Sequence, residues 1–152
     1  MAAKPPFLLV PQRDDHSGRR PLSIVVADDD RDTTVTLASI LRDEGHEVHT
    51  VLRGDEILEL CRYLRPDAVI ADIDMPGMSG YAVARDLHER HSGLAPLLIA
   101  VSGKWTKASD RLVAHAVGFD HYLLKPADPR ELLAILESLR GFAADDQKAR
   151  PA

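Results

Sequence analysis

The chain has 152 residues, of which 45% are hydrophobic and 28% charged, values typical of one globular domain with its own core. Its net charge of −5 excludes a strongly basic surface, and no segment has a DNA-reading motif, so nucleic acid is not expected as a direct partner. The single cysteine excludes an internal disulfide and no apolar run reaches the ~20 residues of a membrane span, so we expect a cytoplasmic protein without membrane contact.

The two ends of the chain are polar or rich in proline. Residues 1–21 contain four of the ten prolines, and the apolar run Phe7–Val10 is too short for a signal peptide. We expect a flexible leader over residues 1–21, one folded domain over residues 22–140 and a flexible tail over residues 141–152. Neither end is long enough for a second domain, which predicts that the folded domain stands alone. The alternative is that the chain is a fragment of a larger protein.

Between these ends, short apolar runs alternate with amphipathic segments. The runs have the length of strands, and they are Leu22–Ala27, Val48–Leu52, Ala68–Ala71, Pro96–Val101 and Tyr122–Leu124. Each is followed by apolar residues three or four positions apart, the spacing of a helix face, as in Leu37, Ile40 and Leu41. Gly45 and Gly118 are typical helix stops.

Five strands alternating with five helices predict an α/β fold, a doubly wound, flavodoxin-like parallel sheet with helices on both faces. The expected strand order is 2-1-3-4-5, in which the order reverses between the first and third strands. Ligands of such sheets bind beyond the carboxyl ends of the strands at this reversal. The residues that follow the first and third apolar runs are therefore the candidates for chemistry.

Acidic residues occupy both of these positions. Asp28, Asp29 and Asp30 follow the first run, and Asp72 follows the third. Two carboxylates about 5 Å apart repel by roughly 3 kcal/mol at an effective dielectric near 20, so such a cluster favours a bound cation or a raised pKa. Carboxylate oxygens with water and a backbone carbonyl suit Mg²⁺. The alternative is that the three consecutive acids only cap the first helix.

Other polar residues follow the remaining strands at the same edge of the predicted sheet. Asp72–Gly80 reads DIDMPGMSG, whose proline and glycines predict a tight loop. Ser102 follows the fourth run, and Lys125 with Pro126 follows the fifth. A carboxylate can accept a phosphoryl group covalently, and phosphoryl transfer needs mainly positioning and neutralisation of the phosphoryl oxygens. A carboxylate, a metal site, a hydroxyl and an ammonium on one rim therefore predict phosphoryl chemistry.

Four motifs resemble those of one signalling family. IVVADDD, RPDAVIADIDMPGMSG, LLIAVSG and GFDHYLLKP occur in the order and at about the spacing of the response-regulator receiver domain. The resemblance covers roughly residues 22–139. It implies that Asp72 accepts the phosphoryl group and that Lys125 and Ser102 take part in the catalysis. The domain would then catalyse only its own phosphorylation and dephosphorylation and would not be an enzyme otherwise.

The resemblance also implies a Mg²⁺ site. Asp28 and Asp29 look like the acidic pair that holds the metal together with Asp72, and the backbone of Asp74 is expected to contribute. Three consecutive acids compete for the two places of the pair. We favour Asp28 and Asp29 over Asp30 because they directly follow the apolar strand.

Switch and rim residues are implied in the same way. Ser102 and Tyr122 look like the hydroxyl and the aromatic residue that change position on phosphorylation. The side chains of Asp74 and Lys104 are expected at the rim of the site, where their opposite charges could pair. Pro126 looks like a proline whose preceding peptide bond is often cis in this family.

The resemblance further implies the kind of partner. A histidine kinase or a histidine phosphotransfer protein would donate the phosphoryl group, and a downstream protein would read the conformational switch, either as a phosphorelay or by binding. A homodimer through the fourth helix, fifth strand and fifth helix is compatible with this reading.

Two other functions are compatible with part of this pattern. Asp72 and Asp74 form the DxD pattern of haloacid-dehalogenase-type phosphatases, but those enzymes carry it after the first strand and need further acidic ligands late in the chain, where this chain has Lys125–Pro126. A degenerate receiver that is never phosphorylated is disfavoured by the intact acceptor, metal, hydroxyl and lysine positions. His88 and His91 lie three apart on a predicted helix without a third metal ligand, which favours a solvated helix face.

Overall fold

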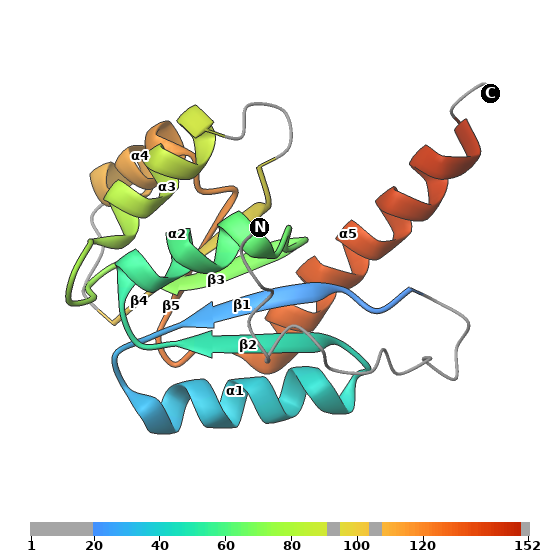
Figure 1. The fold of residues 1–152 in the computed structure, drawn as a ribbon, viewed down its shortest axis with the longest axis horizontal. Helices are drawn as coiled ribbons and strands as arrows, with labels where there is room; N and C mark the ends of the chain where they lie inside the picture. The colour runs from blue at the N-terminus through green and yellow to red at the C-terminus, as the bar shows by residue number, and fades with distance from the viewer. Residues whose placement is uncertain (1–19, 91–94, 104–107, 150–152) are drawn as a thin grey trace.

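The computed structural model of the protein describes residues 20–90, 95–103 and 108–149. Within them, five strands alternate strictly with five helices (Figure 1). The elements are β1 (Ser23–Ala27), α1 (Arg31–Asp43), β2 (Glu47–Val51), α2 (Gly54–Tyr63), β3 (Ala68–Asp72), α3 (Gly80–Arg90), β4 (Leu97–Ser102), α4 (Ala108–Val117), β5 (His121–Leu124) and α5 (Pro129–Ala149).

The strands form one parallel sheet in the order β2-β1-β3-β4-β5. This confirms the predicted fold class and strand order. In the register of the central pairs, Ile24 lies beside Ala68 and Asp72 lies beside Val101. All five strands therefore end at the same edge, and the order reverses between β1 and β3, as the sequence predicted.

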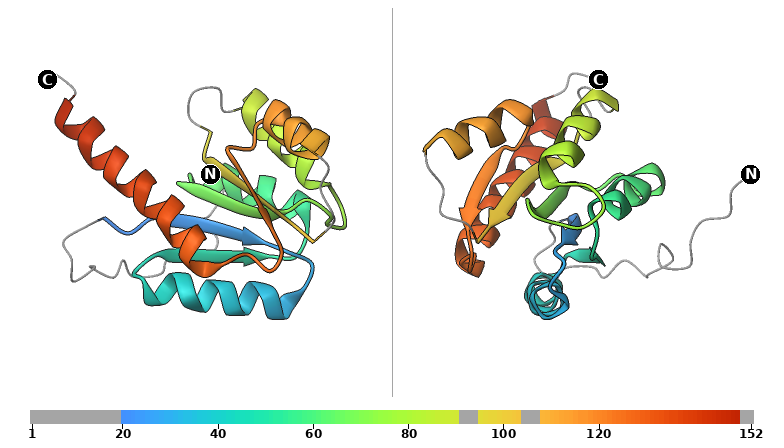
Figure 2. Two further views of the ribbon diagram at one scale, coloured as in Figure 1. Left: turned by 180° about the vertical axis from the view of Figure 1, so that it is seen from behind. Right: turned by 90° about the vertical axis from the view of Figure 1, so that its left-hand side faces the viewer.

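Side chains alternate between the two faces of each strand, and this alternation builds two cores. On one face, Val25 and Val69 pack with residues of α2, α3 and α4. On the other face, Ile24 and Ile70 pack with residues of α1 and α5. Figure 2 shows the two groups of helices on opposite sides of the sheet. A strand residue's position in this alternation therefore determines which face its side chain reaches.

Several predicted boundaries need correction. The strands begin or end within one residue of the predictions, as for β1, which starts at Ser23 instead of Leu22. The larger difference is at the C-terminus, because α5 continues to Ala149 although a flexible tail was expected from residue 141. Alanine, glutamine and lysine in this segment are good helix formers, and polarity alone does not end a helix. Figures 1 and 2 show the end of α5 extending past the sheet.

The leader predicted over residues 1–21 falls almost entirely outside the described residues, so its flexibility stays a prediction. Among the residues that the structure describes, no helix combines the length and the apolar character needed to cross a membrane.

Replacing Gly80 by alanine should destabilise the fold. A Cβ at Gly80 would lie 2.8 Å from Ile73 Cα and 3.0 Å from Asp72 O, both backbone atoms with little room to move. We expect a loss of about 1–3 kcal/mol in the free energy of unfolding, measured by urea denaturation. Gly103→Ala is the matched control, because its Cβ would be 3.7 Å from Lys125 Cδ and should change stability by less than about 0.5 kcal/mol. Equal stability of the two variants would contradict this close packing.

Candidate functional site

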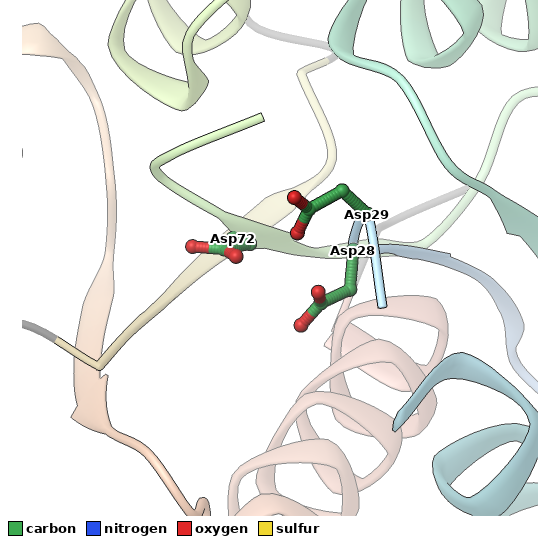
Figure 3. Close-up of side chains that lie close together, drawn as sticks. All are labelled: Asp28, Asp29 and Asp72. Carbon is green, nitrogen blue, oxygen red and sulfur yellow. The ribbon is translucent and has the colours of Figure 1, made fainter. Parts of the chain in front are cut away.

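Three carboxylates meet where β1 and β3 end. Asp28 and Asp29 directly follow β1, and Asp72 is the last residue of β3. One carboxylate oxygen from each of the three lies within 4.8 Å of the others, and Figure 3 shows the three side chains gathered at this edge. Asp28 and Asp72 are buried, whereas Asp29 is exposed. The cluster is thus partly closed toward the protein and open toward solvent on the Asp29 side.

The ammonium group of Lys125 joins the two buried carboxylates. Its Nζ lies 2.7 Å from Asp28 Oδ2 and 2.8 Å from Asp72 Oδ2. Lys125 follows β5 at the far side of the sheet, so its long side chain reaches back across the end of β4 to the cluster. The peptide bond between Lys125 and Pro126 is cis.

Backbone N–H groups hold the remaining carboxylate oxygens. Asp30 N donates to Asp28 Oδ1 at 2.9 Å, and Asp74 N donates to Asp72 Oδ1 at 3.1 Å. Each buried carboxylate therefore has one oxygen on a backbone amide two residues ahead and the other on the Lys125 ammonium. This pattern fixes the direction of both side chains with bonds that favour their charged forms.

Burial and charge act against each other on the pKa values of the cluster. Burial raises the pKa of Asp72 above its ordinary value, and the hydrogen bonds from Lys125 and from the Asp74 N–H offset this only in part. For Lys125, burial lowers the pKa, but the contacts with Asp28 and Asp72 outweigh it and raise the pKa overall. Lys125 is therefore an ammonium at neutral pH, and keeping Asp72 ionised in the folded protein costs stability.

The third acid of the run has a different place. Asp30 is the N-cap of α1, where its Oδ1 accepts a hydrogen bond from Asp32 N at 3.1 Å and its Oδ2 accepts one from Thr33 Oγ1 at 2.9 Å. The bond from Thr33 is the main cause of a lowered pKa at Asp30. Capping and clustering, which were alternatives from the sequence, therefore both occur, and Asp30 is the residue that caps.

The two predicted switch residues lie near each other on one face of the sheet. Ser102 ends β4 and is buried, and Tyr122 on β5 is half-buried and packs against the core of α2, α3 and α4. Tyr122 pairs with Ala100, two residues before Ser102, so by strand alternation Ser102 and Tyr122 reach the same face. The backbone N–H of Lys125 donates to the Ser102 carbonyl at 2.8 Å, which ties the end of β5 to the end of β4.

The remaining predicted residues are less fully placed. Asp74 is exposed at the start of the loop after β3, and its N–H is the group that contacts Asp72. Lys104 and His91 lie outside the described residues. His88 is exposed, as expected, but its Nε2 donates to the Gly118 carbonyl at 3.0 Å, so the ring bridges α3 to the turn before β5.

The first residue of α2 also contacts the loop after β3, which the sequence did not reveal. Gly54 N donates to the Pro76 carbonyl at 3.2 Å. The two residues are 22 positions apart, and no sequence motif links them. Glycines in both segments, Gly54 and Gly77, were the available signal, since a glycine at a turn permits close backbone approach.

The donor set fits Mg²⁺. Three carboxylates converge, two of them held in fixed directions, and hard oxygen ligands with an open, solvent-facing side suit an ion that keeps several waters. Soft ligands are not part of the cluster, since the free Cys61 is buried in α2, and burial raises the pKa of its thiol to about 11. Asp28, Asp29 and Asp72 would hold the metal.

Comparison with known proteins agrees with this geometry. The model of the response regulator receiver domain matches residues 24–137. The DNA-binding response regulator MtrA of Mycobacterium tuberculosis is 35% identical over 111 residues, which are 73% of this chain and 47% of MtrA. A 14.6 kDa protein in the sodA1 3′ region of Leptolyngbya boryana is 34% identical over 116 residues, 76% of this chain and 88% of that protein.

Solved structures give the same result. A CheY-like response regulator receiver domain protein from Methanospirillum hungatei has 28% identity and a TM-score of 0.71, with 84% of this chain and 97% of that chain covered. This chain thus spans almost all of a receiver domain but about half the length of MtrA. Because the family match includes every residue of the acidic site and well over half of the sequence, the chain belongs to the response regulator receiver domain family, whose members signal through phosphorylation.

Proposed function

We propose that this chain acts as a cytoplasmic receiver that accepts a phosphoryl group on Asp72 with Mg²⁺ and reports it to a protein partner. The observation that carries the proposal is the bridge from Lys125 to Asp28 and Asp72, with Nζ within 2.8 Å of both carboxylates. This arrangement presents a carboxylate nucleophile, a cation for the phosphoryl oxygens and an acidic pair at one point. A structural ion pair alone would not need the third, exposed carboxylate of Asp29.

The transfer step follows from these groups. A carboxylate oxygen of Asp72 attacks the phosphorus of a phosphohistidine, the new O–P bond forms as the P–N bond breaks, and the electron pair leaves with the imidazole of the donor. Mg²⁺, when bound, supplies neutralisation of the phosphoryl oxygens. Lys125 supplies a second positive charge, and the Ser102 hydroxyl would donate to a phosphoryl oxygen. Lys104 with Asp74 would shield the rim from water.

We propose a protein as the direct partner on both sides of the reaction. The donor would be a histidine kinase or a histidine phosphotransfer protein, as for the family. The exposed apolar side chains Leu112, Val113 and Leu124, on α4 and β5, support a docking or homodimer face made by α4, β5 and α5. MtrA is a DNA-binding regulator, but the net charge of −5 in this chain favours a protein over nucleic acid as the partner.

The acceptor can be tested directly. Incubation with acetyl phosphate and Mg²⁺ should add one acid-labile, hydroxylamine-sensitive phosphoryl group per chain. The addition is measured by mass spectrometry of the intact protein. Asp72→Asn should add none because its amide is not a nucleophile. Asp74→Asn is the matched control: it removes a neighbouring exposed carboxylate but keeps the backbone N–H that contacts Asp72, and it should still be labelled. Label retained by Asp72→Asn would assign the acceptor elsewhere.

The metal site predicts that Mg²⁺ reverses the order of stability of the parent and the Asp72→Asn variant. The folded pKa of Asp72 is raised, so the stability linked to this group is present below its unfolded pKa and is lost as pH rises through the folded pKa. At pH 7 without metal, Asp72→Asn should therefore be at least as stable as the parent, and the difference should close below about pH 4. With Mg²⁺ at about 100 times its Kd, the parent should gain about 2.7 kcal/mol and Asp72→Asn much less.

Melting temperatures at constant ionic strength measure this ranking. Asp29→Asn should fold like the parent without metal, because Asp29 is exposed, but should gain less from Mg²⁺. Asp43→Asn removes an exposed acid at the other end of α1 and should gain as much as the parent. A parent that gains no stability from Mg²⁺, or an Asp72→Asn variant that gains equally, would rule the site out.

The switch can be followed through the single tryptophan, Trp105, which lies outside the described residues. Beryllofluoride, a phosphoryl mimic, should change its fluorescence in the parent. Ser102→Ala should lose most of this change and still accept a phosphoryl group, because the hydroxyl would pull the end of β4 but is not the acceptor. Ser138→Ala, on the exposed side of α5, should respond like the parent. A full response from Ser102→Ala would show that the signal does not pass through this hydroxyl.

A further inference from the structure

The loop that leaves the acceptor strand is held by a turn from another part of the chain. Residues 73–79 connect β3 to α3 and are called the site loop. Arg53, the N-cap of α2, and the first two residues of that helix, Gly54 and Asp55, are together called the clamp turn. Gly54 N donates to the Pro76 carbonyl at 3.2 Å. The two backbones also touch, because a Cβ added at Gly54 would overlap the carbonyl oxygen of Met78. Only a residue without a side chain allows this approach.

The side chains of the clamp turn make a second contact with the site loop, at Gly77. Gly77 has φ of 85°, which favours glycine. A Cβ at Gly77 would overlap the Asp55 carboxylate and would lie 2.8 Å from Arg53 Nη2. Those two side chains pair with each other, with Arg53 Nε 3.1 Å from Asp55 Oδ1, and both are half-exposed. Gly77 is therefore seated against an ion pair of the clamp turn.

The clamped residues lie between two fixed points of the site. At one end, Asp74 N is bound to the Asp72 carboxylate at 3.1 Å, and at the other, Gly80 N donates to the Ile73 carbonyl at 2.8 Å. The clamp turn acts on the stretch between them, at Pro76, Gly77 and Met78. The position of Asp74, whose backbone carbonyl is a candidate metal ligand, thus depends on a loop that the clamp turn keeps in one conformation.

We infer that Arg53, Gly54 and Asp55 are positioning residues that preorganise the site loop and thereby set the affinity of the acidic site for Mg²⁺. This inference rests on the proposed function and adds its regulation. Ordering a free loop opposes metal binding through lost conformational entropy, so a loop that is already ordered binds the metal more tightly. An exposed ion pair contributes little, so breaking it should weaken Mg²⁺ binding by about two- to fivefold.

The sign of the effect separates positioning from simple charge. If charge alone mattered, Arg53→Gln would tighten Mg²⁺ binding, because it removes a positive charge near the site, and Asp55→Asn would weaken it. If the pair positions the loop, both single variants should have a higher Kd for Mg²⁺ than the parent. The Kd of the double variant should then not exceed the higher of the two single-variant values, because both changes break the same pair. The Kd is measured on unphosphorylated protein by calorimetric titration at low salt. High salt should shrink the difference from the parent, because it screens an exposed pair.

Two matched controls exclude general effects. Arg90→Gln breaks another side-chain pair, that of exposed Arg90 with the partly buried Asp86 at 2.9 Å on α3, and should keep the parent's Kd. Gly77→Ala and Gly45→Ala place a side chain at φ of 85° and 92° respectively, so both bear similar backbone strain. Gly45 precedes β2, at the opposite end of the sheet from the acids, and only Gly77 abuts the clamp turn. Gly77→Ala should weaken Mg²⁺ binding at least as much as Arg53→Gln, and Gly45→Ala should leave it unchanged.

The outcomes distinguish this inference from the proposed function. At saturating Mg²⁺, Arg53→Gln should accept as much phosphoryl group on Asp72 as the parent, because only metal affinity is altered. A parent that neither binds Mg²⁺ nor is labelled on Asp72 would overturn the proposed function. The inference alone would be overturned if the parent binds Mg²⁺ and is labelled on Asp72, but Arg53→Gln has a Kd for Mg²⁺ equal to or lower than that of the parent. If Gly77→Ala does not fold, the exposed Arg53 and Asp55 variants still decide the question.

Discussion

One ammonium group allows this protein to keep two buried carboxylates side by side. Asp28 and Asp72 are both nearly inaccessible to water, and without a cation their charges would repel by several kcal/mol at such separations. Lys125 touches both, and the backbone amides of Asp30 and Asp74 hold their other oxygens. These contacts do not fully offset the cost of burying the charge of Asp72, because burial still raises the pKa of this carboxyl. The remaining uncompensated negative charge favours any further cation that approaches from the exposed Asp29 side.

The parallel sheet explains how four distant segments supply these groups. Parallel strands end at one edge, so the residues that end or directly follow β1, β3, β4 and β5 come together there, although up to 97 positions separate Asp28 from Lys125 in the sequence. The alternation of side chains along each strand then assigns these residues to one face of the sheet or the other. Asp72 is two residues beyond Ile70, which faces α1 and α5, whereas Ser102 is two beyond Ala100, which faces α2, α3 and α4. The acceptor and the proposed switch hydroxyl therefore approach the same edge from opposite faces of the sheet.

This division has a functional consequence for the proposed switch. A group bound to Asp72 and reached by Ser102 would link the two faces, and Tyr122 lies on the Ser102 side against the core of α2, α3 and α4. Movement at the site would thus be passed to the face where α4 and β5 expose Leu112 and Leu124. The site loop contacts a different neighbour, the start of α2. Under the two proposals, metal affinity and output would therefore depend on separate contacts.

Much of this protein could be predicted from its sequence because the signals are local. Apolar runs of strand length alternating with helical spacing determine the fold class, and strand order follows from the rules for such sheets. Asp28, Asp72, Ser102 and Lys125 could be assigned to one edge because each follows an apolar run of strand length in the sequence. The extension of α5 to Ala149 was missed, since polarity suggested a tail although the residues favour a helix.

The tertiary structure decided what depends on close approach between distant residues. Asp30 caps α1 while Asp28 and Asp29 join Asp72, a division that three identical side chains in a row cannot reveal. Lys125 contacts Asp28 as well as Asp72 because both carboxylates point to the same face. The contact of Gly54 with Pro76 and Met78 follows from how the start of α2 meets the loop after β3, and that irregular loop has no periodicity to read. Periodic patterns are set by neighbours along the chain, whereas these contacts are set by which backbones can touch once the sheet has formed.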